Sequence, residues 1–508
     1  MKLKARYIDM DTGELTAVLH EEDCMELGVR EQDRVKIKHE TKDTITAIVH
    51  TTDSVVNPGE IGILGKTFTT LHAESGEEVE VLCTGRPESV DCIKKKMDGG
   101  ELSTEEIRNL VGDIAARNLS NIEMSAYVTA LHINGMNLRE TVDLTIAMVE
   151  SGETIEFDRS PVFDFHSVGG VPGNKVTLII VPIVAAAGFL IPKTSSRAIS
   201  SAGGTADIVE VFAPVEFSSS DLKRIAEKVG GTLAWGGSMN LAPADDLIIR
   251  VEYPLGIDPH AQLLASVMSK KKAAGADYVV IDIPMGEGTK VKNMDEARAY
   301  ARDFIDLGEA LGIKVECAVT YGGQPVGRAI GPSLEAREAI SILEGEKKYP
   351  GSVIEKSCGL AGMLLELGGI GNGVERAKEI LESGRALKKF KEIVQAQGGD
   401  PNVKSKDIKV GQYTYDVAAR KSGYVSAINN KDLVRIARLA GAPKDKGAGI
   451  LLNKKRGHQV EMGETLYTIY AENELKLERA ADMARRTDSV SIEGMLLAKI
   501  PSFSRVNV

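Results

Sequence analysis

The segment that decides the fold runs from Ser195 to Glu210 and reads Ser-Ser-Arg-Ala-Ile-Ser-Ser-Ala-Gly-Gly-Thr-Ala-Asp-Ile-Val-Glu. It gathers hydroxyl side chains, one arginine and the pair Gly203–Gly204 in a short polar turn. Hydroxyls and backbone amides donate hydrogen bonds to oxyanions without having to titrate, and glycine lets a backbone approach a ligand closely. The segment therefore predicts a binding loop for phosphate or a sugar phosphate, although a serine-rich surface loop would share its composition.

A second candidate anion site precedes this segment. Residues 162–166 read as a strand that enters the glycine-containing loop 167–174, and an apolar helix is expected over 175–187. Glycine-rich backbone before a helix presents unpaired N–H groups and a partial positive charge to an anion. The glycines of this loop are Gly169 and Gly170, and an ordinary structural turn would look the same.

The remainder of the chain predicts three parts in order: a β domain, a helical part followed by an α/β part, and a β-rich tail. Short runs that alternate apolar and polar residues fill positions 1–86. From Pro87 the apolar period becomes helical, and apolar strands near 277–283 and 313–319 lie between helices, as in a largely parallel sheet. Three capping-box pairs mark helix starts: Ser103 with Glu106, Ser120 with Glu123, and Asn137 with Glu140.

Position by position, residues 195–210 match the signature of the thymidine and pyrimidine nucleoside phosphorylase family, and the chain resembles that family over roughly residues 87–508. The resemblance implies an α/β multidomain fold: a helical domain, a mixed-sheet α/β domain with a cleft between the two, and a small C-terminal α+β domain. The β-barrel-like residues 1–86 are similar to the N-terminal extension of the archaeal AMP, or nucleoside-monophosphate, phosphorylases. We therefore predict domains at 1–86, 87–160, 161–400 and 401–508, later helices adding to the second.

Carried over residue by residue, the resemblance implies that the two loops bind phosphate and nucleotide. The members of this set are Ser167, Gly169, Gly170, Thr177, Ser195, Ser196, Arg197, Ala198, Ile199, Ser200, Ser201 and Thr205. For the base, the resemblance implies Arg250, Ser266 and Lys270. Arg250 is expected to end an apolar strand. Asp258, Ser266 and Lys270 recur at helical spacing, which also fits the wet face of an amphipathic helix.

One departure from the family concerns the charge of the phosphate site. The nucleoside enzymes carry a lysine before the histidine that corresponds to His166, and this chain has Phe165 there. It carries Lys290 instead, in a loop after a predicted strand where those enzymes usually have an aromatic residue. A solvated lysine would look the same, but the paired change favours Lys290 as the ligand of a 5′-phosphate, which nucleosides lack.

Composition excludes several other classes of protein. A net charge of −11 without a long basic block disfavours nucleic-acid binding, and no apolar stretch is long enough for a membrane span. The five cysteines have no metal-ligand spacing and are typical of a reducing compartment. We therefore expect a cytoplasmic protein with no metal, no cofactor, no membrane partner and no nucleic-acid partner.

The predicted activity is phosphorolysis of nucleoside 5′-monophosphates in nucleotide salvage or degradation: AMP and inorganic phosphate as co-substrate would give adenine and ribose 1,5-bisphosphate, with CMP and UMP also open. The resemblance favours Asp258 as proton donor, with His166 second, and implies a homodimer or a larger homo-oligomer. Two alternatives stay open. One is a pyrimidine nucleoside phosphorylase that uses thymidine or uridine, and the other is a nucleotide-binding or assembly protein that has lost the chemistry.

Overall fold

The computed structural model describes residues 1–39, 44–198, 201–346 and 351–496. The chain forms two compact units. The first consists of Met1–Gly152 and Ala242–Ser269, and the second of Glu153–Leu241 and Lys270–Val508.

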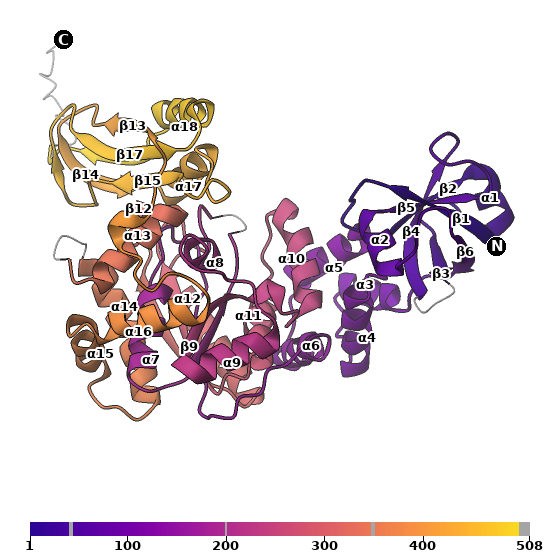
Figure 1. Ribbon diagram of the computed structural model, residues 1–508, viewed down its shortest axis with the longest axis horizontal. Helices are drawn as coiled ribbons and strands as arrows, with labels where there is room; N and C mark the ends of the chain where they lie inside the picture. The colour runs from indigo at the N-terminus through magenta and orange to yellow at the C-terminus, as the bar shows by residue number, and fades with distance from the viewer. Residues whose placement is uncertain (40–43, 199–200, 347–350, 497–508) are drawn as a thin grey trace, which may run out of the picture. The chain divides into compact units, whose positions relative to one another are not determined.

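The first unit begins with a closed six-stranded barrel, which confirms the predicted β domain (Figure 1). Around the barrel the strands follow the order β1-β5-β2-β4-β3-β6. Their bounds are β1 Lys2–Ile8, β2 Thr16–His20, β3 Arg34–Lys38, β4 Thr44–Thr52, β5 Glu60–Leu64 and β6 Glu78–Thr84, with helices α1 Glu21–Leu27 and α2 Gly65–Leu71. The alternation in β3 turns Val35 and Ile37 into the core, as a period of two residues requires.

The rest of the first unit is helical. Its helices are α3 Ser89–Met97, α4 Thr104–Ala115, α5 Asn121–Asn134, α6 Leu138–Glu150 and α10 Pro243–Leu255, together with the first part of α11 His260–Ala273. All three predicted capping boxes form, at the starts of α4, α5 and α6. Arg34 of the barrel donates to the carbonyl of Asn118 at 2.9 Å and pairs with Glu123, so the barrel is joined to the helices by a buried arginine.

The expectation that Arg250 ends a strand was wrong, because Arg250 lies inside α10. Pro243 occupies the start of that helix and two aspartates follow in its first turn, both of which favour a helix N-terminus. The apolar run at 247–249 resembles a strand locally. However, the buried apolar positions Leu247, Ile248 and Val251 recur at helical spacing and pack against the helical core.

The second unit contains the α/β part of the fold. Its main sheet has the parallel order β11-β10-β7, and a parallel pair β8-β9 joins it through the bridge between Val162 and Leu190. The strands are β7 Phe163–Ser167, β8 Ile191–Ser195, β9 Gly231–Trp235, β10 Tyr278–Met285 and β11 Lys314–Tyr321. The helices are α7 Thr177–Ala186, α8 Thr205–Val209, α9 Ser219–Val229, α12 Met294–Ala310, α13 Pro332–Leu343, α14 Gly351–Leu367, α15 Gly373–Glu382 and α16 Arg385–Ala396.

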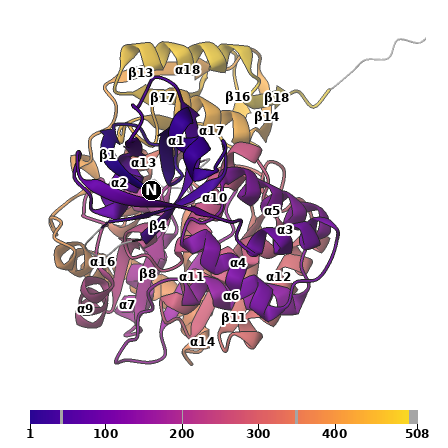
Figure 2. The same cartoon turned by 90° about the vertical axis from the view of Figure 1, so that its right-hand side faces the viewer.

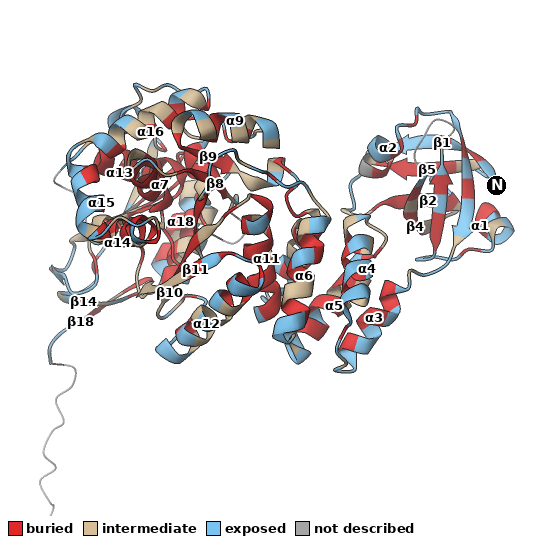
Figure 3. Ribbon diagram, turned by 90° about the horizontal axis from the view of Figure 1, so that it is seen from below, coloured by how far each residue is buried: buried red, intermediate tan, exposed pale blue. Residues whose placement is uncertain are grey.

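Helix α7 is the centre of this core. All but its last residue, Ala186, are buried (Figure 3), and it packs among α14, α16 and β9. It has only ten residues, the first of them threonine, which is too few for a membrane span. Within the described part of the chain, no helix has the length and apolar character needed to cross a membrane.

The C-terminal part of the second unit holds two small antiparallel sheets with two helices beside them (Figure 2). One sheet has the order β12-β15-β17-β13 and the other β16-β14-β18. The bounds are β12 Ala329–Ile330, β13 Tyr413–Ala418, β14 Gly423–Ile428, α17 Asn430–Leu439, β15 Gly449–Leu452, β16 Gln459–Val460, β17 Thr465–Ala471, α18 Glu474–Arg486 and β18 Val490–Glu493. Since β12 precedes α13, the chain of the α/β part itself supplies an edge of this sheet.

A buried lysine joins the start of α7 to the segment before β12. Lys175 is fully buried, pairs with Glu338 and donates to the carbonyls of Val326 and Ala329 at 3.0 and 3.1 Å. Lys175→Met should lower the free energy of unfolding by about 3–5 kcal/mol, because it leaves a buried carboxylate without its cation. Urea unfolding measures the change. Lys94→Met removes an exposed ion pair instead and should be close to neutral; equal losses in the two variants would contradict the prediction.

Candidate active site

The arginine of residues 195–210, the signature segment, binds to the protein itself. Arg197 donates to both carboxylate oxygens of Glu210 at 2.7 Å and to Glu216 at 3.0 Å, and its guanidinium lies 4.6 Å from the centre of the Trp235 ring. These bonds raise the pKa of Arg197 and lower that of Glu210 to about 2. Arg197 therefore braces the loop, and Trp235 packs against it.

A carboxylate and a glycine complete this brace. One oxygen of Asp207 accepts the backbone N–H groups of Ala198 at 2.7 Å and Gly204 at 3.0 Å. A Cβ on Gly204 would lie 2.6 Å from the nitrogen of Ala198, so no larger residue fits there. Close approach does require glycine in this segment, as predicted, but the observed neighbour is the loop's own backbone.

The hydroxyls of the signature segment lie around the end of β8 and the start of α8. Ser195 donates to the carbonyl of Ala234 at 3.0 Å and Ser201 to that of Gly203 at 3.2 Å, while Ser196 is exposed and Thr205 opens α8. Hydroxyls can rotate to accept or donate, so these bonds do not prevent contact with an anion. Two further predicted residues, Ile199 and Ser200, lie outside the described residues.

The loop after β7 adopts a backbone conformation that favours glycine. Gly169 and Gly170 have φ of +89° and +86°. A Cβ on Gly170 would lie 2.8 Å from the backbone nitrogen of Lys290, so the loop that carries Lys290 packs directly against the second candidate anion site. Thr177 is buried as the first residue of α7. The structure thus brings together the loop of Gly169–Gly170 and that of Lys290, which the sequence connected only through the paired change at Phe165 and Lys290.

Ser167, the last residue of β7, is held by a buried aspartate that the sequence did not single out. Its hydroxyl donates to Asp282 at 2.7 Å and accepts from Asn174 at 3.0 Å. Asp282 on β10 is fully buried and also accepts from Thr320 at 2.5 Å, while the ammonium of Lys356 lies 2.8 Å from it. Adjacent parallel strands place these residues side by side, a proximity that only the sheet creates.

A second buried aspartate connects three elements of the site. Asp164 on β7 lies 3.3 Å from the ammonium of Lys193 on β8 and 2.7 Å from that of Lys271 on α11, and all three side chains are at most 5% exposed. Burial opposes ionisation of Asp164, but the two lysines outweigh it and hold the pKa of its carboxyl below its usual range. Burial lowers the pKa of Lys193 to about 7, so at neutral pH this lysine is only partly charged and the trio has a partial positive excess next to His166.

The positive charges of four lysines act on His166. Burial first, and then their positive charges, lower the pKa of His166 well below its ordinary value. The lysines are Lys193, Lys270, Lys271 and Lys290. The imidazole is therefore neutral at pH 7, in a strongly electropositive environment. Phe165, in contrast, is buried in the core of the α/β part and takes no part in this charge.

The predicted base-side residues lie on α10, α11 and the turn between them. Ser266 donates to buried Asp245 of α10 at 2.7 Å, and Gln262, one turn earlier on α11, donates to the other oxygen of Asp245 at 3.1 Å. The polar stripe of α11 is therefore in part a structural contact with α10, as its amphipathic spacing also allowed. Asp258 is exposed just before α11, and Arg250 is exposed on α10.

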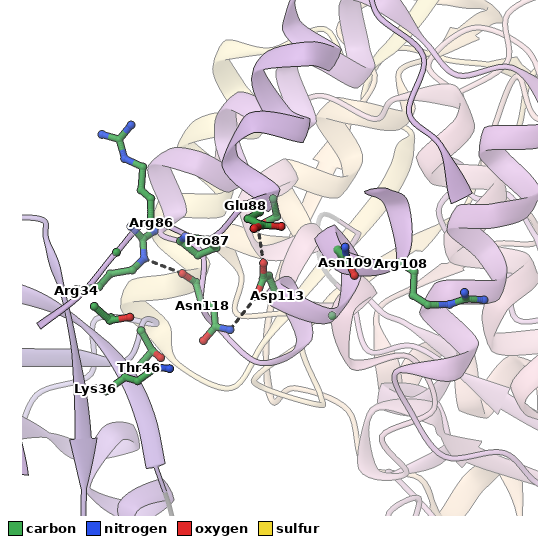
Figure 4. A pocket seen from close by; sticks show the side chains of 14 residues that line it. Arg34, Lys36, Thr46, Arg86, Pro87, Glu88, Arg108, Asn109, Asp113 and Asn118 are labelled. Carbon is green, nitrogen blue, oxygen red and sulfur yellow. Dashed lines mark hydrogen bonds between the residues drawn. The ribbon is translucent and has the colours of Figure 1, made fainter. Parts of the chain in front are cut away.

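A cavity of about 630 Å³ lies in the first unit between the barrel and the helices (Figure 4). None of the predicted site residues lines it. Two of the four cations at its wall form ion pairs, since Arg108 binds Glu150 and Arg34 binds Glu123. Asp113 in the wall accepts hydrogen bonds from Ser89 and Asn118. Because none of the residues that the family resemblance assigns to substrate lies there, we do not place the active site in this cavity.

Comparison with known proteins shows the family to which the chain belongs. Residues 90–152 match the family described as "Glycosyl transferase family, helical bundle domain", 159–387 match its "a/b domain", and 424–491 match "Pyrimidine nucleoside phosphorylase C-terminal domain". An anthranilate phosphoribosyltransferase (TrpD) from Thermus thermophilus shares the fold, with a TM-score of 0.50 and 21% identity over 61% of this chain and 100% of that chain. The chain therefore belongs to the glycosyl transferase family that these domains define.

Full-length relatives narrow the family further. The chain is 53% identical to the AMP phosphorylase of Methanococcoides burtonii over 509 residues, which are 100% of each chain. It is 54% identical to the AMP phosphorylase of Thermococcus kodakarensis over 503 residues, which are 98% of this chain and 99% of that one. This chain belongs to the family of the AMP phosphorylases, as its N-terminal barrel and signature segment predicted.

The lowered pKa of His166 predicts an acid-dependent loss of stability. Below about pH 6.5 the unfolded chain protonates this histidine while the folded chain does not, so stability falls as pH falls toward the folded pKa. As the pH is lowered through that window, the free energy of unfolding of His166→Gln should rise relative to that of the wild type by up to about 1.4 kcal/mol for each pH unit. Urea unfolding at about pH 8 and about pH 5.5 measures this difference. His132→Gln, at an exposed position of α5, is the control, and parallel pH curves for His166→Gln and wild type would contradict the prediction.

Proposed function

We propose that this enzyme cleaves the glycosidic bond of AMP with inorganic phosphate and yields adenine and ribose 1,5-bisphosphate. The observation that carries the proposal is the close packing of the loop of Lys290 against Gly170 of the candidate anion site, where the charges of four lysines also act on His166. It stands in a chain that is 53–54% identical over its whole length to proteins named AMP phosphorylases.

The charge of the site suits a substrate pair with two phosphate groups. Inorganic phosphate and the 5′-phosphate of a nucleotide bring two anions, whereas a nucleoside with phosphate brings one. Position 165 holds no lysine, because Phe165 is buried in the core there. Lys290, in the loop after β10, approaches the loop of Gly169 and Gly170 instead. We assign Lys290 to the 5′-phosphate, and the loop of Ser167, Gly169 and Gly170 with the signature hydroxyls to inorganic phosphate.

The reaction follows from these positions. An oxygen of phosphate attacks C1′ from the face opposite the base and forms the new C–O bond with inversion. The C1′–N bond breaks, and its electron pair goes to the departing base. Positive charge builds up on the sugar in such cleavages, and the phosphate anion itself balances it. The balance needs no metal or redox cofactor, so we propose that phosphate is the sole co-substrate.

The departing adenine needs a proton, and the structure bears on which residue supplies it. A histidine whose pKa is far below 7 is neutral at that pH and holds no imidazolium proton to give. We therefore assign the proton to Asp258 and assign to neutral His166 a hydrogen-bonding role. Ser266 and Lys270, one turn apart on α11, are assigned to substrate on the base side, together with Arg250. The base preference, the oligomeric state and the cellular compartment stay predictions from the sequence.

Release of free base, followed by chromatography, tests the substrate. The wild type should release base from AMP only when phosphate is present. Lys290→Ala should lower kcat/KM for AMP by about tenfold to hundredfold, the usual effect of a lost bond to a charged group, and should leave adenosine turnover almost unchanged. Lys292→Ala, which removes an exposed cation two residues later, is the matched control. Equal losses on AMP and adenosine would overturn the assignment of Lys290, and release from thymidine alone would favour a nucleoside enzyme.

Substitution of the proposed proton donor gives a second prediction. Asp258→Asn should lower kcat for AMP by about 10²- to 10⁴-fold, the usual range for loss of a general acid. In N7-methylated AMP the base already carries a positive charge and can leave without a proton. The variant should therefore cleave this substrate almost as fast as the wild type does. If Asp258→Asn turns over AMP normally, or if the methylated substrate is equally impaired, Asp258 is not the donor.

A further inference from the structure

Asn430 of the C-terminal domain contacts the loop that carries Lys290. It is the first residue of α17 and is 2% exposed. Its side-chain amide donates to the carbonyl of Gly322 at 2.9 Å, and a Cβ on Gly288 would lie 3.4 Å from the Cβ of Asn430. One buried side chain thus binds the turn after β11 and lies next to the turn after β10.

These two turns pack against each other. The backbone N–H of Gly322 donates to the carbonyl of Met285 at 2.8 Å, and a Cβ on Gly286 would lie 2.6 Å from the nitrogen of Gly323. Thr289 closes the first turn, since its hydroxyl donates to the carbonyl of Gly286 at 2.7 Å. A shift of either turn would therefore move the other.

The turn after β10, which carries Lys290, also lies against the loop of Gly169 and Gly170, called here the phosphate loop. Because Lys290 approaches Gly170 closely, as described above, the turn lies between the phosphate loop and α17. Gly170 is required for this close approach, whereas a Cβ on Gly288 would make an ordinary contact with Asn430. The position of Lys290 therefore depends on the contacts that hold the turn after β10 in place.

A second set of contacts from the C-terminal domain secures the segment after β11. The ammonium of Lys455 lies within hydrogen-bond distance of the carbonyls of Pro325 and Gly327, at 2.5 and 2.8 Å, and is 9% exposed. The backbone N–H of the next residue, Arg456, donates to the side chain of Gln324 at 3.1 Å. The C-terminal domain thus grips residues 322–327 at both ends, and Asn430 is the contact nearest to Lys290.

We propose that Asn430 is a positioning residue for Lys290, through which the C-terminal domain sets recognition of the 5′-phosphate. The inference rests on the proposed function, in which Lys290 binds that phosphate. The side-chain oxygen of Asn430 is buried and accepts no hydrogen bond from any described residue, which is costly for an acceptor. The residue is therefore poorly explained by local stability, and its one bond, to Gly322, acts on the geometry of the turns.

Steady-state kinetics of the full-length enzyme test the proposal. Asn430→Ala should raise KM for AMP by roughly threefold to tenfold, the effect of one lost hydrogen bond, with kcat and KM for phosphate within about twofold of wild type. Tyr467→Phe removes another buried hydrogen bond of the same domain, the 2.7 Å contact with Ser489, and should leave all three constants unchanged. If the alanine variant does not fold, Asn430→Asp keeps the shape but replaces the donor with an acceptor, and should raise KM for AMP at least as much.

A double-mutant cycle separates this inference from the proposed function. In a Lys290→Ala background, Asn430→Ala should have almost no further effect on KM for AMP, because it acts through the missing lysine. Additive losses, an equal rise in KM for phosphate, or the same loss in Tyr467→Phe would overturn the role of Asn430. If Lys290→Ala itself leaves KM for AMP unchanged, the assignment of the 5′-phosphate fails first. If Lys290→Ala raises it and Asn430→Ala does not, only the positioning role fails.

Discussion

The contact of Asp164 with Lys193 and Lys271 is the interaction on which the arrangement of the phosphate-binding elements depends. One buried carboxylate joins β7, β8 and α11, which lead respectively to the phosphate loop, to the signature segment and to Lys270. Buried charges are tolerated when they are paired, and removal of one partner is strongly destabilising. The pairing therefore restricts the three elements to one mutual placement. Because burial lowers the pKa of Lys193 to about 7, the two lysines exceed the carboxylate by less than one positive charge at neutral pH, and this partial excess favours anions at the site.

Buried lysines perform two different tasks in the second unit. Lys193 and Lys271 add to the field at His166, together with the less buried Lys270 and exposed Lys290. Lys175 and Lys455 instead donate to backbone carbonyls of the segment 325–329. This segment connects the α/β part to the C-terminal sheet through β12. The C-terminal domain is consequently part of the frame around the active-site turns.

Local sequence signals predicted much of the fold because they act over a few residues. The capping boxes of α4, α5 and α6, the alternation in β3 and the glycines at 169–170 all depend on near neighbours, and all form as expected. Arg250 shows where the approach fails. An apolar run of three residues fits a strand or a buried helix equally well, and the choice was made by packing of α10 against α4 and α5. Ser266 is similar, because its bond to Asp245 joins two helices whose contact no periodicity reveals.

The sequence by itself determined the family, the order of the domains and the segments that carry the site, since residues 195–210 and the loop 167–174 hold that information in consecutive positions. Only the tertiary structure decided what their side chains do. Arg197 binds Glu210 and lies over Trp235, and Ser167 donates to Asp282. Asn430 lies next to the turn that carries Lys290, although 140 residues of chain separate the two. The physical reason is that burial decides whether a charge or hydroxyl meets protein or ligand, and burial is a property of elements distant in sequence that pack together.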